Sequence, residues 1–237
     1  MSKSLFLFFV LCAVLVSSPV WAVSGALGKI VVLTDDILIG SDMFDKEDSF
    51  EELLKKKIID LYSEKMEVVT MAQEGATTVS SMAFVPQVLA EKPNLVIIAI
   101  GYNDALAKNN PDVVYNNLDN LLKELERAGA YVLLIGVEAP VWMEHSYATK
   151  FNNIYPRISQ RYQVIYHNGF LKGVQGNPEL TLEDRYHPNR LGVEKIVDNI
   201  LPGLGPVIKT LRRVRSCERN PNGHNCEKYL PQDATKR

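Results

Sequence analysis

The chain of 237 residues lacks a strong excess of either charge, with 26 Lys and Arg against 28 Asp and Glu and a pI near 6.1. A protein that holds nucleic acid by its phosphates usually carries a basic surface or stripe. The basic residues that do cluster lie near the end of the chain: Lys209, Arg212, Arg213, Arg215 and Arg219. Such a cluster is typical of a solvated tail. We therefore predict no nucleic-acid partner.

Long apolar runs are also missing, apart from one near the amino terminus. After a single lysine the chain is apolar over residues 5–16, and Val20-Trp21-Ala22 then offers a small-residue cleavage site, as in a secretory signal peptide. The run is shorter than the roughly 20 residues that cross a bilayer. We expect the mature chain to begin at Val23, to carry no transmembrane anchor and to be periplasmic or secreted. An uncleaved anchor is the alternative.

Cysteine is scarce, and one of the three, Cys12, lies in the apolar run. The other two, Cys217 and Cys226, bracket a polar loop, and an even pair in an exported protein indicates a disulfide. Two free thiols are the alternative. Only His224 lies between the two cysteines, so a zinc site there would lack a fourth ligand. We expect no metal or other cofactor.

Repeats and low-complexity linkers are absent, and an apolar content of 46% in a chain of this length can form one sizeable core. Apolar runs typical of buried parallel strands alternate with segments of helical spacing. The alternation predicts a three-layer α/β/α domain, a doubly wound parallel sheet of about five strands. We expect a signal peptide over 1–22, this domain over 23–208, and a polar basic tail over 209–237. The first expected strand begins at Ile30 and ends in Thr34-Asp35-Asp36, and the others are 66–71, 94–100, 131–137 and 164–167. The expected helices are 49–65, 78–91, 112–128, 147–162 and 193–201.

Polar residues follow three of the expected strands and recur in one late turn. Thr34-Asp35-Asp36-Ile37 ends the first strand, Gly75 follows the second, and Tyr102-Asn103-Asp104 follows the third. Asp184 and His187 lie three residues apart, so both can face one pocket. In a sheet of this kind, ligands bind beyond the carboxyl ends of the strands. The four blocks therefore predict a single site.

In order and spacing these blocks resemble the SGNH/GDSL hydrolase family. Within it they are most similar to the exported bacterial arylesterase, acyl-CoA thioesterase and lysophospholipase branch. Tyr147, Phe151 and Tyr155 are similar to an aromatic run of that branch, and the resemblance covers about residues 28–208. It implies hydrolysis of an ester or thioester bond.

The resemblance also implies roles for the site residues. His187 would be the general base and Asp184 the carboxylate that orients it. Gly75 and Asn103 would donate hydrogen bonds to the oxyanion, one from a backbone N–H and one from a side-chain amide. Without the resemblance, Gly75 is equally well explained by a left-handed turn and Asn103 by a helix cap. Asp104 is expected to be structural.

The first block departs from the family pattern Gly-Asp-Ser-Leu, because Asp36 takes the position of the nucleophilic serine and Thr34 that of the glycine. A serine attacks an ester to give a covalent acyl-enzyme. A carboxylate is a poor replacement, because the mixed anhydride it forms expels the carboxylate again more readily than an alkoxide leaves. It can also accept the hydrogen bonds of Gly75 and Asn103. The first hypothesis is therefore a catalytically impaired or noncatalytic SGNH-like protein.

Two other hypotheses stay open. In one, the protein is an active ester hydrolase in which Asp36 or His187 activates water, or in which Ser41 replaces the serine. In the other, Asp35, Asp36 and Asp184 hold a hard divalent cation through oxygen ligands. Asp35 matches the family's own aspartate, which favours a structural hydrogen-bond acceptor. The ligands that the resemblance implies are small acyl esters, thioesters, lysophospholipids and acetylated glycans, and the sequence does not choose among them.

Overall fold

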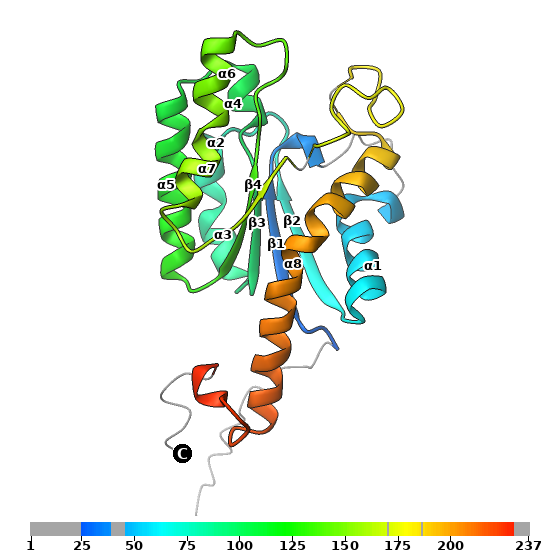
Figure 1. Ribbon diagram of the computed structural model, residues 1–237, viewed down its shortest axis with the longest axis vertical. Coiled ribbons are helices and arrows are strands. Elements are labelled where there is room, and N and C mark those ends of the chain that lie inside the picture. The colour runs from blue at the N-terminus through cyan, green and yellow to red at the C-terminus, as the bar shows by residue number, and fades with distance from the viewer. Residues whose placement is uncertain (1–24, 39–45, 170, 186, 230–237) are drawn as a thin grey trace, which may run out of the picture.

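A computed structural model describes residues 25–38, 46–169, 171–185 and 187–229. Its centre is a sheet of five parallel strands in the order β2-β1-β3-β4-β5 (Figure 1). The strand order reverses between β1 and β3, so the carboxyl ends of these two strands form the switch point at which α/β proteins bind ligands. The strands are β1 (Gly28–Thr34), β2 (Met66–Ala72), β3 (Leu95–Ala99), β4 (Tyr131–Gly136) and β5 (Ile165–Asn168).

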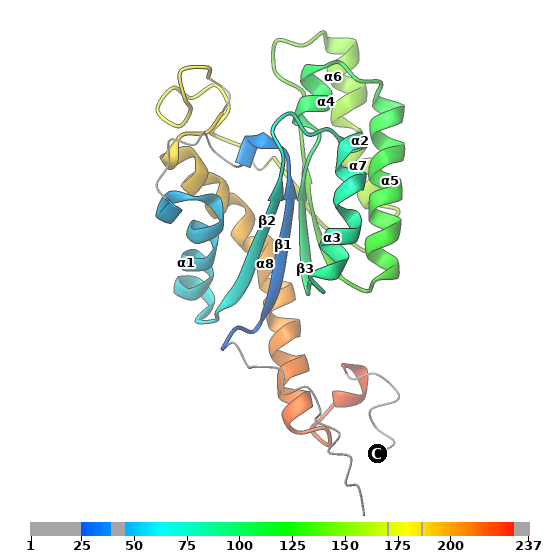
Figure 2. The same cartoon turned by 180° about the vertical axis from the view of Figure 1, so that it is seen from behind.

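Helices cover both faces of the sheet, which confirms the predicted three-layer architecture. In Figures 1 and 2, α1 and α8 lie on one face and α2, α3, α5, α6 and α7 on the other. The helices are α1 (Phe50–Tyr62), α2 (Thr78–Ser81), α3 (Val85–Ala90), α4 (Tyr102–Leu106), α5 (Pro111–Arg127), α6 (His145–Asn152), α7 (Ile154–Ser159) and α8 (Arg190–Arg219).

The two central strands are buried on both sides. All five residues of β3 are inaccessible, and Ile30 to Leu33 of β1 are fully buried. A strand covered by helices on both faces has no solvent side, which is why its sequence reads as a continuous apolar run instead of alternating with polar residues. This burial holds the ends of β1 and β3 rigidly beside each other.

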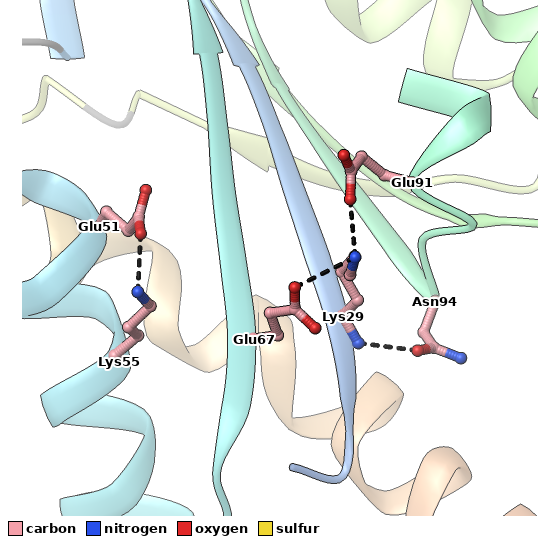
Figure 3. Close-up of polar contacts among 6 residues, drawn as sticks. All are labelled: Lys29, Glu51, Lys55, Glu67, Glu91 and Asn94. Carbon is pink, nitrogen blue, oxygen red and sulfur yellow. Dashed lines mark hydrogen bonds and ion pairs between the residues drawn. The ribbon is translucent and has the colours of Figure 1, made fainter. Parts of the chain in front are cut away.

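The amino end of the sheet is closed by polar contacts around Lys29, as Figure 3 shows. The Lys29 ammonium lies 3.1 Å from Glu67 on β2 and 2.6 Å from Glu91 after α3, and its backbone N–H donates to Asn94 at 2.8 Å. These contacts join β1 to both of its neighbours. Ion pairs this exposed contribute little energy, on the order of 1 kcal/mol or less.

Two expected helices are divided in the structure, and one short helix is additional. The segment predicted as one helix over 78–91 is divided into α2, a 3-10 turn and α3, which begins with Val85 and Pro86. The helix expected over 147–162 is divided into α6 and α7. The short helix α4 was not expected.

The largest difference concerns the last helix. It was expected to end at Leu201, but α8 continues through Pro202 and Pro206 to Arg219. The continuation is held by packing, since Leu204, Val207 and the apolar residues at 208 and 211 are buried. The predicted start of the polar tail at residue 209 therefore lies inside a helix. No helix in the described ranges is long and apolar enough to cross a membrane.

Candidate functional site

Three of the four polar blocks meet at the switch point through the side chain of Asp36. One carboxylate oxygen of Asp36 accepts a hydrogen bond from the Gly75 backbone N–H at 3.2 Å, and the other accepts from the Asn103 amide at 2.7 Å. The same amide donates to the Ala76 carbonyl at 3.1 Å. Gly75 has a φ of 68°, in the left-handed region that glycine adopts without strain. Asp36 is thus placed between the two groups predicted to bind an oxyanion.

Asn103 is positioned by a turn that requires glycine. Gly101, with a φ of 124°, precedes α4, and a Cβ at this position would lie 2.0 Å from the Tyr155 hydroxyl. That hydroxyl donates to the carbonyl of Ile100 at 2.6 Å. The close approach of Tyr155 fixes the end of β3, and α4 then directs Asn103 toward Asp36.

Asp35 points away from Asp36 into the protein and is fully buried. Its carboxylate accepts hydrogen bonds from the backbone N–H groups of Ile37 at 3.3 Å, Gly101 at 3.1 Å and Tyr102 at 3.0 Å. The pKa of Asp35 is raised to about 7, because burial and the negative charge of Asp36 raise it by more than the backbone hydrogen bonds lower it. These contacts join the end of β1 to the turn after β3. They are those expected of a structural hydrogen-bond acceptor.

Asp104 is also structural. It accepts hydrogen bonds from the Thr78 backbone at 2.7 Å, the Thr78 hydroxyl at 3.1 Å and the Asn109 amide at 2.9 Å. Tyr147 donates to the Asn109 carbonyl at 3.0 Å and stacks on Phe151 with a ring separation of 5.8 Å. Tyr147 therefore connects α6 to the loop that follows α4.

The fourth block forms a turn that pairs Asp184 with His187. The Leu182 N–H donates to the His187 carbonyl at 2.8 Å, and Arg185 takes a φ of 64°, so the chain reverses between them. One oxygen of Asp184 accepts from the His187 backbone at 3.0 Å, and the other lies 2.7 Å from Nδ1 of the imidazole. An Nδ1–H held in this way leaves Nε2 as the basic nitrogen. α8 begins directly after this turn, where the Asn189 side chain caps it by accepting from Gly192 at 3.0 Å.

The structure therefore links the predicted residues in two groups. Hydrogen bonds join Asp36, Gly75 and Asn103, and a separate pair of contacts joins Asp184 to His187. No group of three or more His, Cys, Asp or Glu within the described ranges is placed to hold a metal ion, so the alternative of a carboxylate metal site has no support there. Ser41, the alternative nucleophile, lies outside the described residues.

A hollow next to the site was not foreseen from the sequence. It has a volume of about 610 Å³ and lies at the carboxyl ends of β4 and β5. Gln175, which lines it, donates to the hydroxyl of Tyr102 at 3.1 Å and so connects the hollow to the block that contains Asn103. No sequence pattern marks Gln175, because its role depends on how the loop after β5 folds back. The lining residues are Gly136, Glu138, Asn168, Gly169, Leu171, Lys172, Gly173 and Gln175.

Comparisons with known proteins identify a family and several similar proteins. Residues 35–195 match the GDSL-like Lipase/Acylhydrolase family. An arylesterase of Vibrio mimicus is 31% identical over 168 residues, which span 70% of this chain and 83% of that protein. The esterase TesA of Pseudomonas aeruginosa is 27% identical over 77% of this chain and 91% of its own length. A crystal structure of TesA superposes with a TM-score of 0.71 at 28% identity, covering 76% of this chain and 99% of that one.

Proposed function

Starting from the fact that this chain belongs to the GDSL-like lipase/acylhydrolase family, we propose that it is an exported ester-binding member whose own Asp36 occupies the oxyanion site. Asp36 stands in the position of the nucleophilic serine, so hydrolysis is strongly impaired. The remaining site residues keep the roles expected of them, with His187 as base, Asp184 as its partner, and Gly75 and Asn103 as oxyanion donors.

One observation carries this proposal. Asp36 accepts hydrogen bonds from both Gly75 and Asn103, at 3.2 Å and 2.7 Å. In an ester hydrolase, donors of this kind stabilise the negative oxygen that develops in the transition state, and the loss of one costs about 10²- to 10³-fold in rate. A fixed carboxylate engages both donors before any substrate arrives. It therefore competes with the transition state for the groups that would stabilise it.

A second candidate function is an active hydrolase in which water replaces the serine. The contact of 2.7 Å between Asp184 and the Nδ1 of His187 favours it, because a histidine oriented in this way can remove a proton from water as well as from serine. Asp36 would then orient the water or share in its deprotonation. Replacement of Asp36 distinguishes the two candidates.

The ligand that we propose is a small ester. The relatives are named as an arylesterase and an esterase, and the hollow of about 610 Å³ beside Tyr102 offers space for a compact molecule. Thioesters, lysophospholipids and acetylated glycans remain within the proposal as the ligand classes that the resemblance implies. The exposed Glu138, Asn168 and Lys172 give the hollow a polar rim.

For the organisation of the chain, we keep the signal peptide over 1–22, the hydrolase-like domain over 23–208 and the basic segment over 209–237 as a proposal. Export to the periplasm or the medium follows from the charged start, the apolar run and the site after Ala22. Residues 1–24 lie outside the described part of the structure, so this proposal rests on the sequence.

The replacement Asp36→Ser tests the proposal in one step. It removes the carboxylate from the two donors and supplies the serine that the family pattern has at this position. Loss of the serine from a working triad enzyme costs on the order of 10⁶ in kcat, so even incomplete repair should raise the hydrolysis of a short-chain 4-nitrophenyl ester by at least about 10²-fold. The wild type should hydrolyse the same ester little faster than buffer.

Two variants make the measurement specific. Asp36→Ala removes the carboxylate without adding a nucleophile and should stay inactive, and His187→Ala in the Asp36→Ser background should abolish the gain. Rapid turnover by the wild type that is lost in Asp36→Ala would favour the water mechanism instead. Wild-type turnover that survives Asp36→Ala but is lost in Ser41→Ala would mean that the nucleophile is Ser41.

A further inference from the structure

The far end of α8 is a feature that the ester site does not use. The family match ends at residue 195, whereas α8 continues to Arg219 and extends past the amino end of the sheet (Figure 1). Residues 220–229 then fold back along the helix. They are held there by the disulfide between Cys217 and Cys226, and Arg213 donates a hydrogen bond to the carbonyl of His224.

One face of this part of α8 is basic. Lys209, Arg212, Arg213 and Ser216 follow each other at intervals of three, one and three residues, which places them on the same side of a helix. Together with Thr210 and Tyr229 they line a hollow of about 350 Å³, which we call the basic hollow. All six lining side chains are at least partly exposed.

The charge of this region is opposite to that of the molecule. Residues 206–229 contain six basic and two acidic residues, a formal charge of +4, in a chain whose net charge is -2. Within the described ranges, the basic hollow has no acidic residue in its lining. The excess positive charge is therefore concentrated at one end of the molecule, away from the carboxyl ends of the strands.

Some basic side chains of this region interact with other parts of the domain, and others have no acidic partner among the described residues. Arg212 forms an ion pair with Glu64 at 2.7 Å, and Arg215 donates to the carbonyl of Ala26. The acceptor of Arg213 is a neutral carbonyl, and no carboxylate among the described residues pairs with Lys209. Lys209 and Arg213 therefore supply most of the positive potential of the basic hollow.

The side chains that line the basic hollow favour a phosphate ligand. Ammonium and guanidinium groups form strong, charge-assisted hydrogen bonds to phosphate oxygens, and the hydroxyls of Thr210 and Ser216 add neutral donors. Tyr229 lies across from them, 37% exposed, with its ring 5.8 Å from the Arg213 guanidinium. A partly exposed tyrosine suits the boundary between water and lipid, because its ring is apolar and its hydroxyl is polar.

We propose that the basic hollow binds the phosphate headgroups of an anionic membrane surface. The lining groups are spread along an exposed helix face instead of enclosing a single anion, and the helix projects from the domain, so a flat surface can reach it (Figure 1). This inference does not rest on the proposed ester site. It would hold the domain at the membrane by its amino-end side and leave the carboxyl ends of the strands facing away from the bilayer.

The test is sedimentation of the mature chain with lipid vesicles. The protein should bind vesicles made of equal parts phosphatidylglycerol and phosphatidylcholine and should not bind vesicles of phosphatidylcholine alone. Raising the ionic strength from about 0.1 M to about 1 M shortens the Debye length from about 10 Å to about 3 Å and should release it. Lys209→Glu with Arg213→Glu should weaken binding by at least about tenfold, because a basic residue near an anionic surface contributes severalfold in affinity.

The matched control carries the same charge change elsewhere. Lys56→Glu with Lys123→Glu, on exposed positions of α1 and α5, should bind nearly as the wild type does. The proposal is overturned if both double variants lose binding equally, since net charge alone would then explain it. It is also overturned if phosphatidylcholine vesicles bind equally well, if millimolar inorganic phosphate displaces the vesicles, or if a DNA duplex binds more tightly than the vesicles. Thermal melting of each variant establishes that it is folded.

Discussion

Asp35 and Asp36 are consecutive carboxylates that the fold places in different surroundings. Asp35 is fully buried and accepts three backbone hydrogen bonds, whereas Asp36 is half-buried at the end of β1 and faces Gly75 and Asn103. β1 ends at Thr34 and a 3-10 turn begins at Asp36, so the two side chains leave the chain where its direction changes. The contacts of the first join the end of β1 to the turn after β3, and the second is the residue on which the proposed function depends.

The pKa of Asp35 leads to a prediction about stability. Burial raises this pKa from 3.8 to about 7, so the folded protein binds the proton more tightly than the unfolded chain. The stability that Asp35 contributes is fully present below the unfolded value and is lost as the pH rises through the folded value. The free energy of unfolding of the wild type should therefore fall, relative to that of Asp35→Asn, from about pH 4 to about pH 7. Urea unfolding at a series of pH values measures this difference.

The control for this measurement is Asp60→Asn, an exposed aspartate on α1. Its stability should follow the wild-type curve with pH. A constant difference between wild type and Asp35→Asn at all pH values would mean that the Asp35 carboxyl does not titrate in this range. The Asn variant is expected to be less stable at low pH. Its amide nitrogen replaces one of the two oxygens that accept backbone hydrogen bonds, so at least one backbone N–H loses its acceptor.

Helix α8 combines two tasks along its length. Its first turn follows His187 directly and fixes the turn that pairs this histidine with Asp184, while its last turns carry the basic hollow. At about 1.5 Å per residue, a helix of this length extends for about 45 Å. One element therefore connects the ester site to the opposite end of the molecule, and the disulfide closes that end.

Removal of the disulfide should have a local effect. Cys217 and Cys226 are nine residues apart, and closing so short a loop stabilises a protein by about 3 kcal/mol at most. The segment that it holds lies outside the sheet and its helical layers. The double variant Cys217→Ser, Cys226→Ser should keep nearly the wild-type Tm and should be cleaved much faster by protease within residues 220–229. Reduced wild type should behave as this variant does, and global unfolding of the variant would show that the segment belongs to the cooperative core.

We propose functional sites at both ends of the molecule. The strands end at the ester site, with its polar hollow, and they begin near the basic end of α8. Arg215 donates to the Ala26 carbonyl, so the first described residues lie against this basic end. The predicted cleavage after Ala22 would leave three residues before Ala26.

Export can be tested by measuring the intact mass of the exported protein. The protein recovered from the cell envelope or the medium should have the intact mass of a chain that begins at Val23, because the residues before the site at Ala22 are those that signal peptidases accept. Ala22→Arg places a large charged residue where a small one is needed and should leave the full-length chain uncleaved. Full-length wild type in the cytosol would contradict the localisation that we propose.

Much of the fold can be predicted from short stretches of the sequence. Neighbouring residues alone form the apolar runs of β1 and β3 and the helical spacing of α1 and α5. The alternation of these segments predicts the layered parallel sheet that the structure has. The blocks around Asp36, Asn103 and His187 are visible for the same reason, since each is a short pattern at the end of an element. The family assignment follows from their order and is confirmed by the match over residues 35–195.

What the sequence did not decide depends on contacts between distant residues. Pro202 and Pro206 disfavour a helix, yet α8 continues because its apolar face is buried against the rest of the domain. The hydrogen bond between Gln175 and Tyr102 joins residues 73 positions apart, and no sequence pattern marks it. Local propensity determines which elements form, whereas only packing fixes which side chains meet. The sequence by itself therefore indicated Asp36 and its two hydrogen-bond partners, Gly75 and Asn103, whereas the length of α8 and both hollows were decided by the tertiary structure.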